Sequence, residues 1–166
     1  MKFTMDDLAK SLCMSKKTLY KYFRDKEELF LAMVEYMFDS IAESKREVLK
    51  SRGDTLEKIR RILGVMPEGY SNLDLRQLYG LRADYPEIYK EVEKRLESGW
   101  EETMELLQQG MEEGVIRKLP LCLVKLMMEA TLEQFFQRDI LIQNNLTYQQ
   151  ALDEVIDILV DGIRST

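Results

Sequence analysis

The sequence predicts an all-α protein. Apolar residues recur at three- and four-residue intervals over most of the 166 residues, whereas no long alternation of Val, Ile and Thr indicates strands. The three prolines, Pro67, Pro86 and Pro120, stand where this helical period breaks. Since 45% of the residues are hydrophobic and 33% are charged, the composition is that of an ordinary globular chain that can bury a sizeable core.

The first 30 residues predict two short helices joined by a tight turn. Thr4 can cap the first helix, and Asp6 and Asp7 place negative charge in its first turn, where the helix dipole favours it. Cys13 falls at the turn, and Ser15 can cap the second helix. Helices this short are marginal alone, so packing must hold them. The side chains expected to provide that packing are Leu8, Ala9, Leu12, Leu19 and Phe23.

The second helix of this pair is expected to carry an exposed basic and aromatic surface. Residues 1–26 contain seven Lys or Arg and three Asp, a net charge of +4, whereas the remaining residues have a net charge of −10. A basic end on an acidic body would turn toward phosphate. Two short helices of this kind have the plan of a helix-turn-helix reader of double-stranded DNA. The polar and aromatic side chains of the second helix are Lys16, Lys17, Thr18, Tyr20, Lys21 and Tyr22.

The same stretch resembles the DNA-binding signature of the TetR family of bacterial transcriptional regulators. The resemblance runs without a gap over residues 3–30, through Leu8-Ala9-Lys10-Ser11-Leu12, Thr18-Leu19-Tyr20, Tyr22-Phe23 and Asp25-Lys26-Glu27-Glu28-Leu29. It implies a dimeric regulator, a repressor, that binds palindromic operator DNA and is released by a small-molecule effector. It also implies that Lys16, Lys17 and Tyr20 face base edges and that Thr4, Thr18, Tyr22 and Lys26 contact phosphates, with Ser15 completing the DNA-binding set.

The chain departs from the family pattern in two places. Glycine is usual where this chain has Cys13, because a turn residue with positive φ is easiest for glycine, so Cys13 should carry strain or adopt a different turn. The family also has a further helix before these two, whereas only two residues precede Phe3 here. A truncated chain, a mis-assigned start and a naturally short protein all fit this. In each case Leu8, Leu12, Leu19 and Phe23 should be partly uncovered.

Longer helices are expected in the rest of the chain. Asp25 can cap a helix that continues to about Lys50, so that residues 25–52 connect two domains. These domains would be a helix-turn-helix DNA-binding region, 1–30, and a helical effector-binding and dimerisation domain, 31–166. Further helices are expected over 55–66, 73–84, 86–113, 119–144 and 147–163.

The last two of these helices present more apolar surface than a monomer of this size covers easily. The helix over 119–144 is apolar on nearly all sides, and the helix over 147–163 has a wide apolar stripe. A four-helix dimer interface, with two helices from each subunit, explains both and is the dimer that the resemblance implies. The residues expected there are Leu123, Met127, Val155, Ile156, Leu159, Val160 and Ile163.

The resemblance further implies an effector cavity within the second domain. Methionines and aromatic residues at helical spacing also fit a plain core, but ten methionines suit an adaptable apolar pocket. The ligand would then be largely apolar or amphipathic. The residues expected to contact it are Met66, Tyr70, Leu78, Tyr79, Trp100, Met104 and Met128.

Catalytic, metal-binding and membrane functions have little support in the sequence. The chain has no histidine, which removes the usual general base, and Cys13 and Cys122 lie far apart without metal-ligand spacing. We therefore expect no enzyme activity, no metal, no cofactor, no membrane partner and a cytoplasmic location. Two other functions stay open. One is a truncated dimeric protein that binds a small molecule but not DNA, and the other is a helical enzyme or storage protein.

Overall fold

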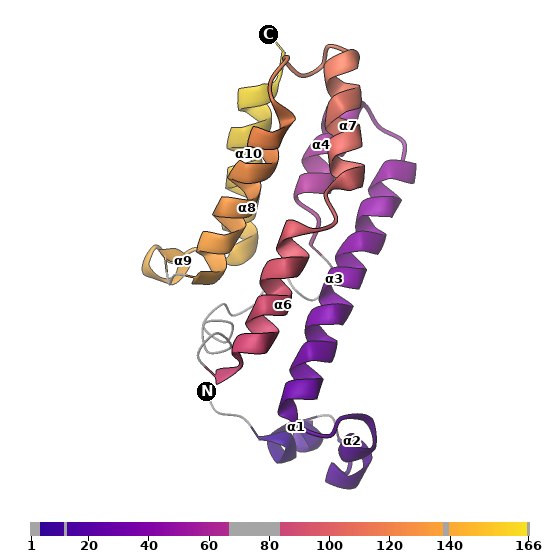
Figure 1. The fold of residues 1–166 in the computed structure, drawn as a ribbon, viewed down its shortest axis with the longest axis vertical. Helices are drawn as coiled ribbons and strands as arrows, with labels where there is room; N and C mark the ends of the chain where they lie inside the picture. The colour runs from indigo at the N-terminus through magenta and orange to yellow at the C-terminus, as the bar shows by residue number, and fades with distance from the viewer. Residues whose placement is uncertain (1–3, 12, 67–83, 138–139, 166) are drawn as a thin grey trace.

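The computed structural model describes residues 4–11, 13–66, 84–137 and 140–165, and it confirms the all-α class. Apart from one antiparallel bridge between Ile116 and Arg164, the regular structure of these residues is helical. The predicted helix over 73–84 falls almost entirely outside the described residues. The helices are α1 Met5–Ser11, α2 Lys16–Tyr22, α3 Lys26–Lys50, α4 Thr55–Leu63, α6 Pro86–Glu97, α7 Glu101–Glu112, α8 Leu121–Gln137, α9 Ile140–Gln143 and α10 Tyr148–Ile163 (Figure 1).

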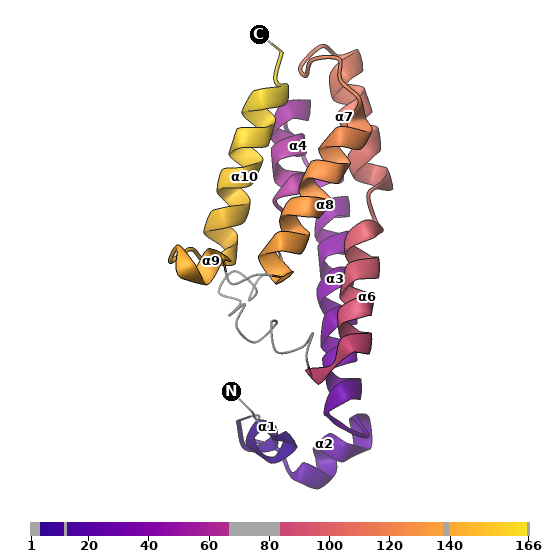
Figure 2. The ribbon, with the colours of Figure 1, turned by 60° about the vertical axis from the view of Figure 1, so that its left-hand side comes forward.

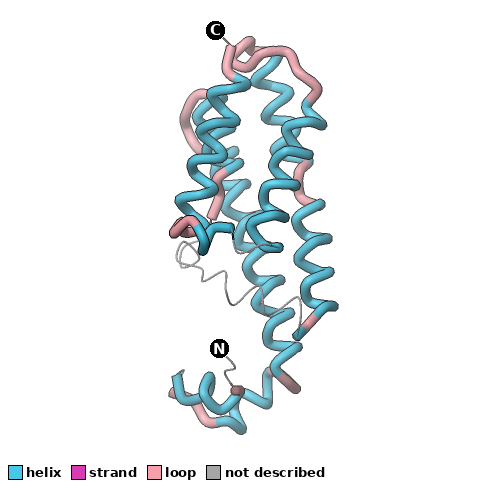
Figure 3. Tube along the Cα trace, turned by 90° about the vertical axis from the view of Figure 1, so that its left-hand side faces the viewer, coloured by secondary structure: helices cyan, strands magenta, loops and turns pink. Residues whose placement is uncertain are grey.

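Helices α1 and α2 form a small unit at one end of the molecule, which we call the reading head (Figure 3). Its core consists of Met5, Ala9, Leu19 and Leu29, with Phe23 packed against them. Leu19 is only 2% exposed, so the prediction that it would be partly uncovered is wrong. Met5 and Leu29 provide the cover that the sequence analysis did not anticipate, while Phe23 is half-buried as predicted.

Helix α3 joins the reading head to the rest of the chain, which we call the body. The Asp25 side chain accepts from the backbone N–H of Glu28 at 2.9 Å at its start, and Ser51 caps its end. At 1.5 Å per residue its 25 residues span about 37 Å without a break. Leu29, in the first turn, belongs to the core of the reading head, whereas Val48, in the last, belongs to the core of the body. One rigid element therefore contributes to both units.

The body is a bundle built around α4. Helix α4 packs against α3, α7 and α10, while α6 packs against α3 and α8 (Figure 2). Ile59 and Ile62 of α4 and Leu107 of α7 are fully buried at its centre. Gly110 of α7 lies so close to α4 that a Cβ there would be 2.9 Å from Ile59 Cδ1. Helix α10 completes the bundle by packing on α4, and α8 packs on α6 and α7.

The single helix predicted over 86–113 is two helices in the structure. Helix α6 ends at Glu97 and α7 begins at Glu101, because Gly99 adopts a left-handed conformation with φ of +72°. The Trp100 indole Nε1 donates to the carbonyl oxygen of Leu96 at 3.0 Å across this break. Both helices contact the same core, so the apolar periodicity of the sequence continues across the break. The break at Gly99 could therefore not be seen in that periodicity.

The predicted helix over 119–144 is also divided, into α8 and α9. Within one chain, α8 is buried on one side only. Val124 and Met128 are buried, but Leu123, Leu126 and Met127 are each about half exposed. An apolar surface of α8 is therefore uncovered within one chain.

Candidate nucleic-acid interface and ligand cavity

Helix α2 begins at a side-chain cap. Ser15 has extended backbone geometry, and its Oγ accepts from the backbone N–H of Thr18 at 3.0 Å and lies 2.7 Å from the Thr18 hydroxyl. Thr4 plays the same part for α1, where its Oγ1 accepts from the backbone N–H of Asp7 at 3.2 Å. Its own N–H and hydroxyl donate to Asp7 Oδ2 at 2.9 and 2.8 Å. These bonds lower the pKa of Asp7, the backbone N–H having the larger effect. Both caps of the reading head match the predictions.

The exposed side of α2 holds the residues predicted to contact bases. Lys16 and Tyr20 lie one turn apart on one face, and Lys17 lies beside them. Tyr22 stands one turn beyond Thr18 and is 71% exposed. Helix α2 thus presents ammonium groups and phenol rings to solvent, as an element that enters a major groove requires.

Lys16 is not free, however. Its Nζ lies 2.7 Å from Asp6 Oδ1 of α1 and 5.9 Å from the centroid of the Tyr20 ring. The hydrogen bond to Asp6 raises the pKa of Lys16, so the lysine stays charged. Asp6 was assigned only to the dipole of α1 by the sequence, but in the structure it also orients the first basic side chain of α2.

The turn between α1 and α2 strains Cys13, as expected from its sequence position. Its φ is +52°, in the left-handed region. The Cys13 N–H donates to the Lys10 carbonyl at 3.1 Å, and the Met14 N–H donates to the Ala9 carbonyl at 2.9 Å. This is the hydrogen-bond pattern of a Schellman motif, in which glycine normally occupies the position of Cys13.

Lys26, the eighth predicted DNA contact, lies where the reading head meets the body. Its Nζ is 5.3 Å from the centroid of Phe30 and 5.9 Å from that of Tyr85. The two rings are in edge-to-face contact at 5.3 Å. Because Tyr85 caps the start of α6, this aromatic cluster connects the first turns of α3 and α6. Lys26 is therefore positioned by the body as well as by its own helix.

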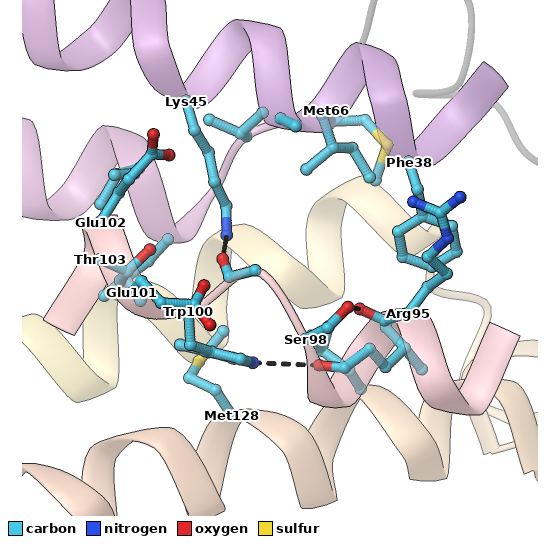
Figure 4. Close-up of a pocket in the computed structure, with 18 of the residues that line it drawn as sticks. Phe38, Lys45, Met66, Arg95, Ser98, Trp100, Glu101, Glu102, Thr103 and Met128 are labelled. Carbon is cyan, nitrogen blue, oxygen red and sulfur yellow. Dashed lines mark hydrogen bonds between the residues drawn. The ribbon is translucent and has the colours of Figure 1, made fainter. Parts of the chain in front are cut away.

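A cavity of about 370 Å³ lies inside the body between α3, α4, the α6–α7 junction, α8 and α10 (Figure 4). Of the residues predicted to contact an effector, Met66, Trp100 and Met128 line this cavity, whereas Met104 packs against the core without lining it. Tyr70, Leu78 and Tyr79 fall outside the described residues. The hydrophobic side chains that complete the lining are Phe38, Ile41, Ala42, Ile62, Leu63, Val65, Leu96, Leu132, Tyr148 and Leu152.

Lys45 extends from α3 across this cavity (Figure 4) and was not predicted. Its Nζ donates to the Gly99 carbonyl at 3.0 Å and lies 5.4 Å from the centroid of Trp100. Burial lowers the pKa of Lys45, and the charges of Glu102 and Glu101 partly oppose that effect. Its position follows Phe38 and Ile41 and precedes Val48 at helical spacing, so a lysine within an apolar stripe was the available signal.

Thr103 of α7 is the second polar group that the sequence analysis missed. It lines the same cavity, is 1% exposed, and its hydroxyl has no hydrogen-bond partner among the described residues. A buried hydroxyl without a partner costs about 1–3 kcal/mol. The cavity therefore combines apolar walls with a few polar groups, as small-molecule sites do, and the Thr103 hydroxyl is the buried one that has no partner among the described residues.

The exposed apolar surface of α8 meets α10 along a groove of about 420 Å³. Leu123, Met127, Val155, Leu159 and Ile163 of the predicted interface line it. Ile156 and Val160 instead point into the core of their own chain, where they are 2% and 0% exposed, because the opposite face of α10 packs on α4. The sequence analysis also missed Ile158, which lines the groove and is 72% exposed.

Neither metal chemistry nor membrane insertion is supported by the residues that the structure describes. Among them, no group of three or more Cys, Asp or Glu is arranged to hold a metal ion. None of their helices is both long enough and apolar enough to span a bilayer.

A helix-turn-helix with a basic, exposed second helix, carried by a helical body with an internal cavity, defines a DNA-binding transcriptional regulator. Residues 2–33 match the model of a family described as "Bacterial regulatory proteins, tetR family". Over 162 residues the chain is 26% identical to the uncharacterized HTH-type transcriptional regulator YvaF of Bacillus subtilis strain 168, covering 97% of this chain and 85% of that one. The match to the TetR family of bacterial transcriptional regulators thus covers residues 2–33, and the similarity to an HTH-type regulator extends along nearly the whole chain.

Solved structures show the same fold along the whole chain. The fatty acid degradation regulator FadR from Bacillus halodurans matches with a TM-score of 0.66 and 19% identity, covering 99% of this chain and 88% of that one. The ketosteroid transcriptional regulator KstR2 of Mycobacterium tuberculosis matches with a TM-score of 0.62 and 21% identity, covering 99% and 86%. At these identities the likeness concerns the fold alone.

Proposed function

We propose that this regulator is a cytoplasmic repressor that binds palindromic operator DNA as a homodimer and is released by a small, largely apolar effector. The observation that carries the proposal is helix α3. It contributes Leu29 to the core of the reading head and Lys45 to the cavity of the body. A ligand in the cavity and DNA at the reading head would therefore act on the same rigid element.

DNA binding is supported by the surface of α2. Lys17 and Tyr20 are exposed and stand beside Lys16 in its first turns. A lysine that pairs with guanine O6 and N7 discriminates by about 1–3 kcal/mol, whereas phosphate contacts add affinity on any sequence. Lys17→Ala is therefore expected to reduce binding to the operator and relax sequence choice. Lys26→Ala is expected to weaken binding equally on operator and random DNA.

Dimerisation through α8 and α10 is supported by the apolar groove between them. Leu123, Met127 and Ile158 expose large apolar side chains at this groove, which a second copy related by a two-fold axis would cover. Ile158→Asp is expected to convert the dimer to a monomer in light scattering after size exclusion. Tyr36→Asp is the matched control, because Tyr36 is similarly exposed but lies on α3, outside the groove. A dimer that survives Ile158→Asp would exclude this interface.

Release by an effector follows from reciprocal coupling. If DNA and ligand favour different separations of the two reading heads, each must weaken binding of the other by the same factor. The similar structures, which are named as a fatty acid degradation regulator and a ketosteroid transcriptional regulator, are compatible with a largely apolar ligand here. The apolar lining of the cavity is the independent support from this chain.

The test is fluorescence anisotropy with DNA fragments that flank the gene of this protein, repeated over a salt series. A repressor should bind one fragment more tightly than random DNA, with affinity falling steeply as salt rises. The same titration on this chain and on one extended by an upstream helix would show whether that helix raises the affinity for DNA. If neither form distinguishes flanking from random DNA, a local operator is refuted.

A further inference from the structure

We propose that Lys45 binds the anionic head group of the effector, and that the effector is therefore an amphiphile with an apolar body and a single carboxylate. This inference rests on the proposed function in one respect, which is that the cavity inside the body is the effector site. It adds the residue that recognises the ligand and the chemical class of that ligand.

The first support is that Lys45 is a partly buried cation without a counter-ion. In the described part of the chain it forms no ion pair, and its one hydrogen bond goes to the neutral carbonyl of Gly99. The two arginines that line the same cavity are paired: Arg46 lies 3.0 Å from Glu43, and Arg95 lies 3.1 Å from Glu91. An ammonium group has three donors, and only one of those of Lys45 is used by the Gly99 carbonyl. Charge-assisted hydrogen bonds of this kind are the stronger ones.

The second support is the start of α7, which faces the same space. The N-cap residue Trp100 makes no side-chain hydrogen bond to the first turn of α7, so the backbone N–H groups of that turn have no side-chain cap. Thr103 in this turn is 1% exposed, and its hydroxyl has no partner in the described residues. Figure 4 shows Lys45 and Thr103 approaching the cavity from α3 and α7. A carboxylate there would accept from both side chains and would satisfy the buried hydroxyl.

The neighbouring acids limit the ligand to one negative charge. Glu101 and Glu102 stand in the first turn of α7, and both act on Lys45 electrostatically. Glu102 lies 3.9 Å from Arg46, which offsets its charge, and Glu101 is exposed. A monoanion would pair with Lys45, whereas a dianion such as a phosphate monoester would be repelled by these carboxylates.

Ligand binding at Lys45 would also alter the contact between α3 and the α6–α7 junction. The carbonyl of Gly99 is the present acceptor for Lys45, and a ligand carboxylate would compete with it. Since Gly99 has a left-handed φ at the break between two helices, the junction is a point where small backbone changes are easiest. The head group of the ligand would therefore act at the contact between α3 and the α6–α7 junction. The apolar part of the ligand would provide affinity.

The experiment is calorimetric titration of the DNA-free protein with decanoate, decyl phosphate, 1-decanol and decylamine, all below micelle formation. Decanoate is expected to bind at least about tenfold more tightly than 1-decanol, with decyl phosphate and decylamine weaker than decanoate. Lys45→Met keeps the apolar stem and should abolish the preference for decanoate while leaving 1-decanol binding intact. Lys58→Met is the matched control, because Lys58 also donates to a backbone carbonyl, that of Leu49 at 3.1 Å, but lies outside the cavity.

Equal affinities for decanoate and 1-decanol, tighter binding of decyl phosphate, or a preference that survives Lys45→Met would each overturn the inference. Failure of all four probes to bind would also overturn it. The proposed function fails on a different measurement, the lack of selective, salt-sensitive binding to flanking DNA. A protein that selects operator DNA but treats decanoate and 1-decanol alike would remain a repressor with another class of effector.

Discussion

Replacing Cys13 by glycine should stabilise the reading head. Cys13 has a φ of +52°, and a residue with a Cβ pays about 1–2 kcal/mol in that left-handed conformation. Glycine removes that strain but has a more flexible unfolded chain, which costs roughly 0.5–1 kcal/mol. The net gain for Cys13→Gly is therefore about 0.5–1 kcal/mol. It should leave the two turn hydrogen bonds, from Cys13 to Lys10 and from Met14 to Ala9, unchanged.

Native-state hydrogen exchange of the amides of α1 and α2 would measure this gain. A stabilisation of about 0.5–1 kcal/mol slows exchange by roughly two- to fivefold if these amides exchange through opening of the reading head. Asn145→Gly is the matched control, because Asn145 has a φ of +54° in the same hydrogen-bond pattern, with its N–H on Ile142 and that of Leu146 on Leu141. Asparagine tolerates this conformation, so its replacement should gain little. Faster exchange in Cys13→Gly, or an equal gain from Asn145→Gly, would refute the reasoning.

Three other predictions concern the head and the body. Asp6→Asn frees Lys16, so binding to random duplex DNA should tighten and the slope of log K against log salt should steepen by about 0.9 per reading head. Asp39→Asn, in the body, is the control. An unchanged slope in Asp6→Asn would mean that Lys16 does not contact phosphate. Gly110→Ala forces a Cβ to 2.9 Å from the fully buried Ile59, so the free energy of unfolding should fall by about 1–3 kcal/mol in urea denaturation. Gly162→Ala is the control, because a Cβ there meets open space, and it should not lower the free energy of unfolding. Thr4 lowers the pKa of Asp7, so the contribution of that carboxylate to the stability of the reading head is present above the ordinary aspartate pKa and is lost as pH falls through the lower folded value. Thr4→Val should raise the pKa of Asp7 in an NMR titration. An unchanged pKa would exclude the hydroxyl as a cause.

The parts of the fold that depend on local rules could be predicted from the sequence. Ser15 and Asp25 cap their helices as expected, and the left-handed strain at Cys13 was anticipated because its position usually belongs to glycine. The break at Gly99 could not be found this way. A single glycine is tolerated within a helix, and the apolar period continues from Leu96 through Trp100 into α7.

The polar groups of the cavity were missed for a related reason. Helical periodicity finds apolar stripes and does not select the polar residues within them, such as Lys45 and Thr103. Their proximity depends on how α3 meets the α6–α7 junction, which no local pattern encodes. The division of α10 between two partners was likewise visible only once α4 was seen to cover Ile156 and Val160.

The separate core of the reading head has a consequence for the lifetime of the protein. Four buried side chains, Met5, Ala9, Leu19 and Leu29, hold the head, whereas the body has a much larger core. The head should therefore melt locally while the body remains folded. Bound DNA would oppose this melting by mass action, adding about 2.7 kcal/mol at a free DNA concentration one hundred times the dissociation constant. A copy released from its operator would then be the copy most open to proteolysis, so that occupancy of the DNA would protect the regulator from degradation.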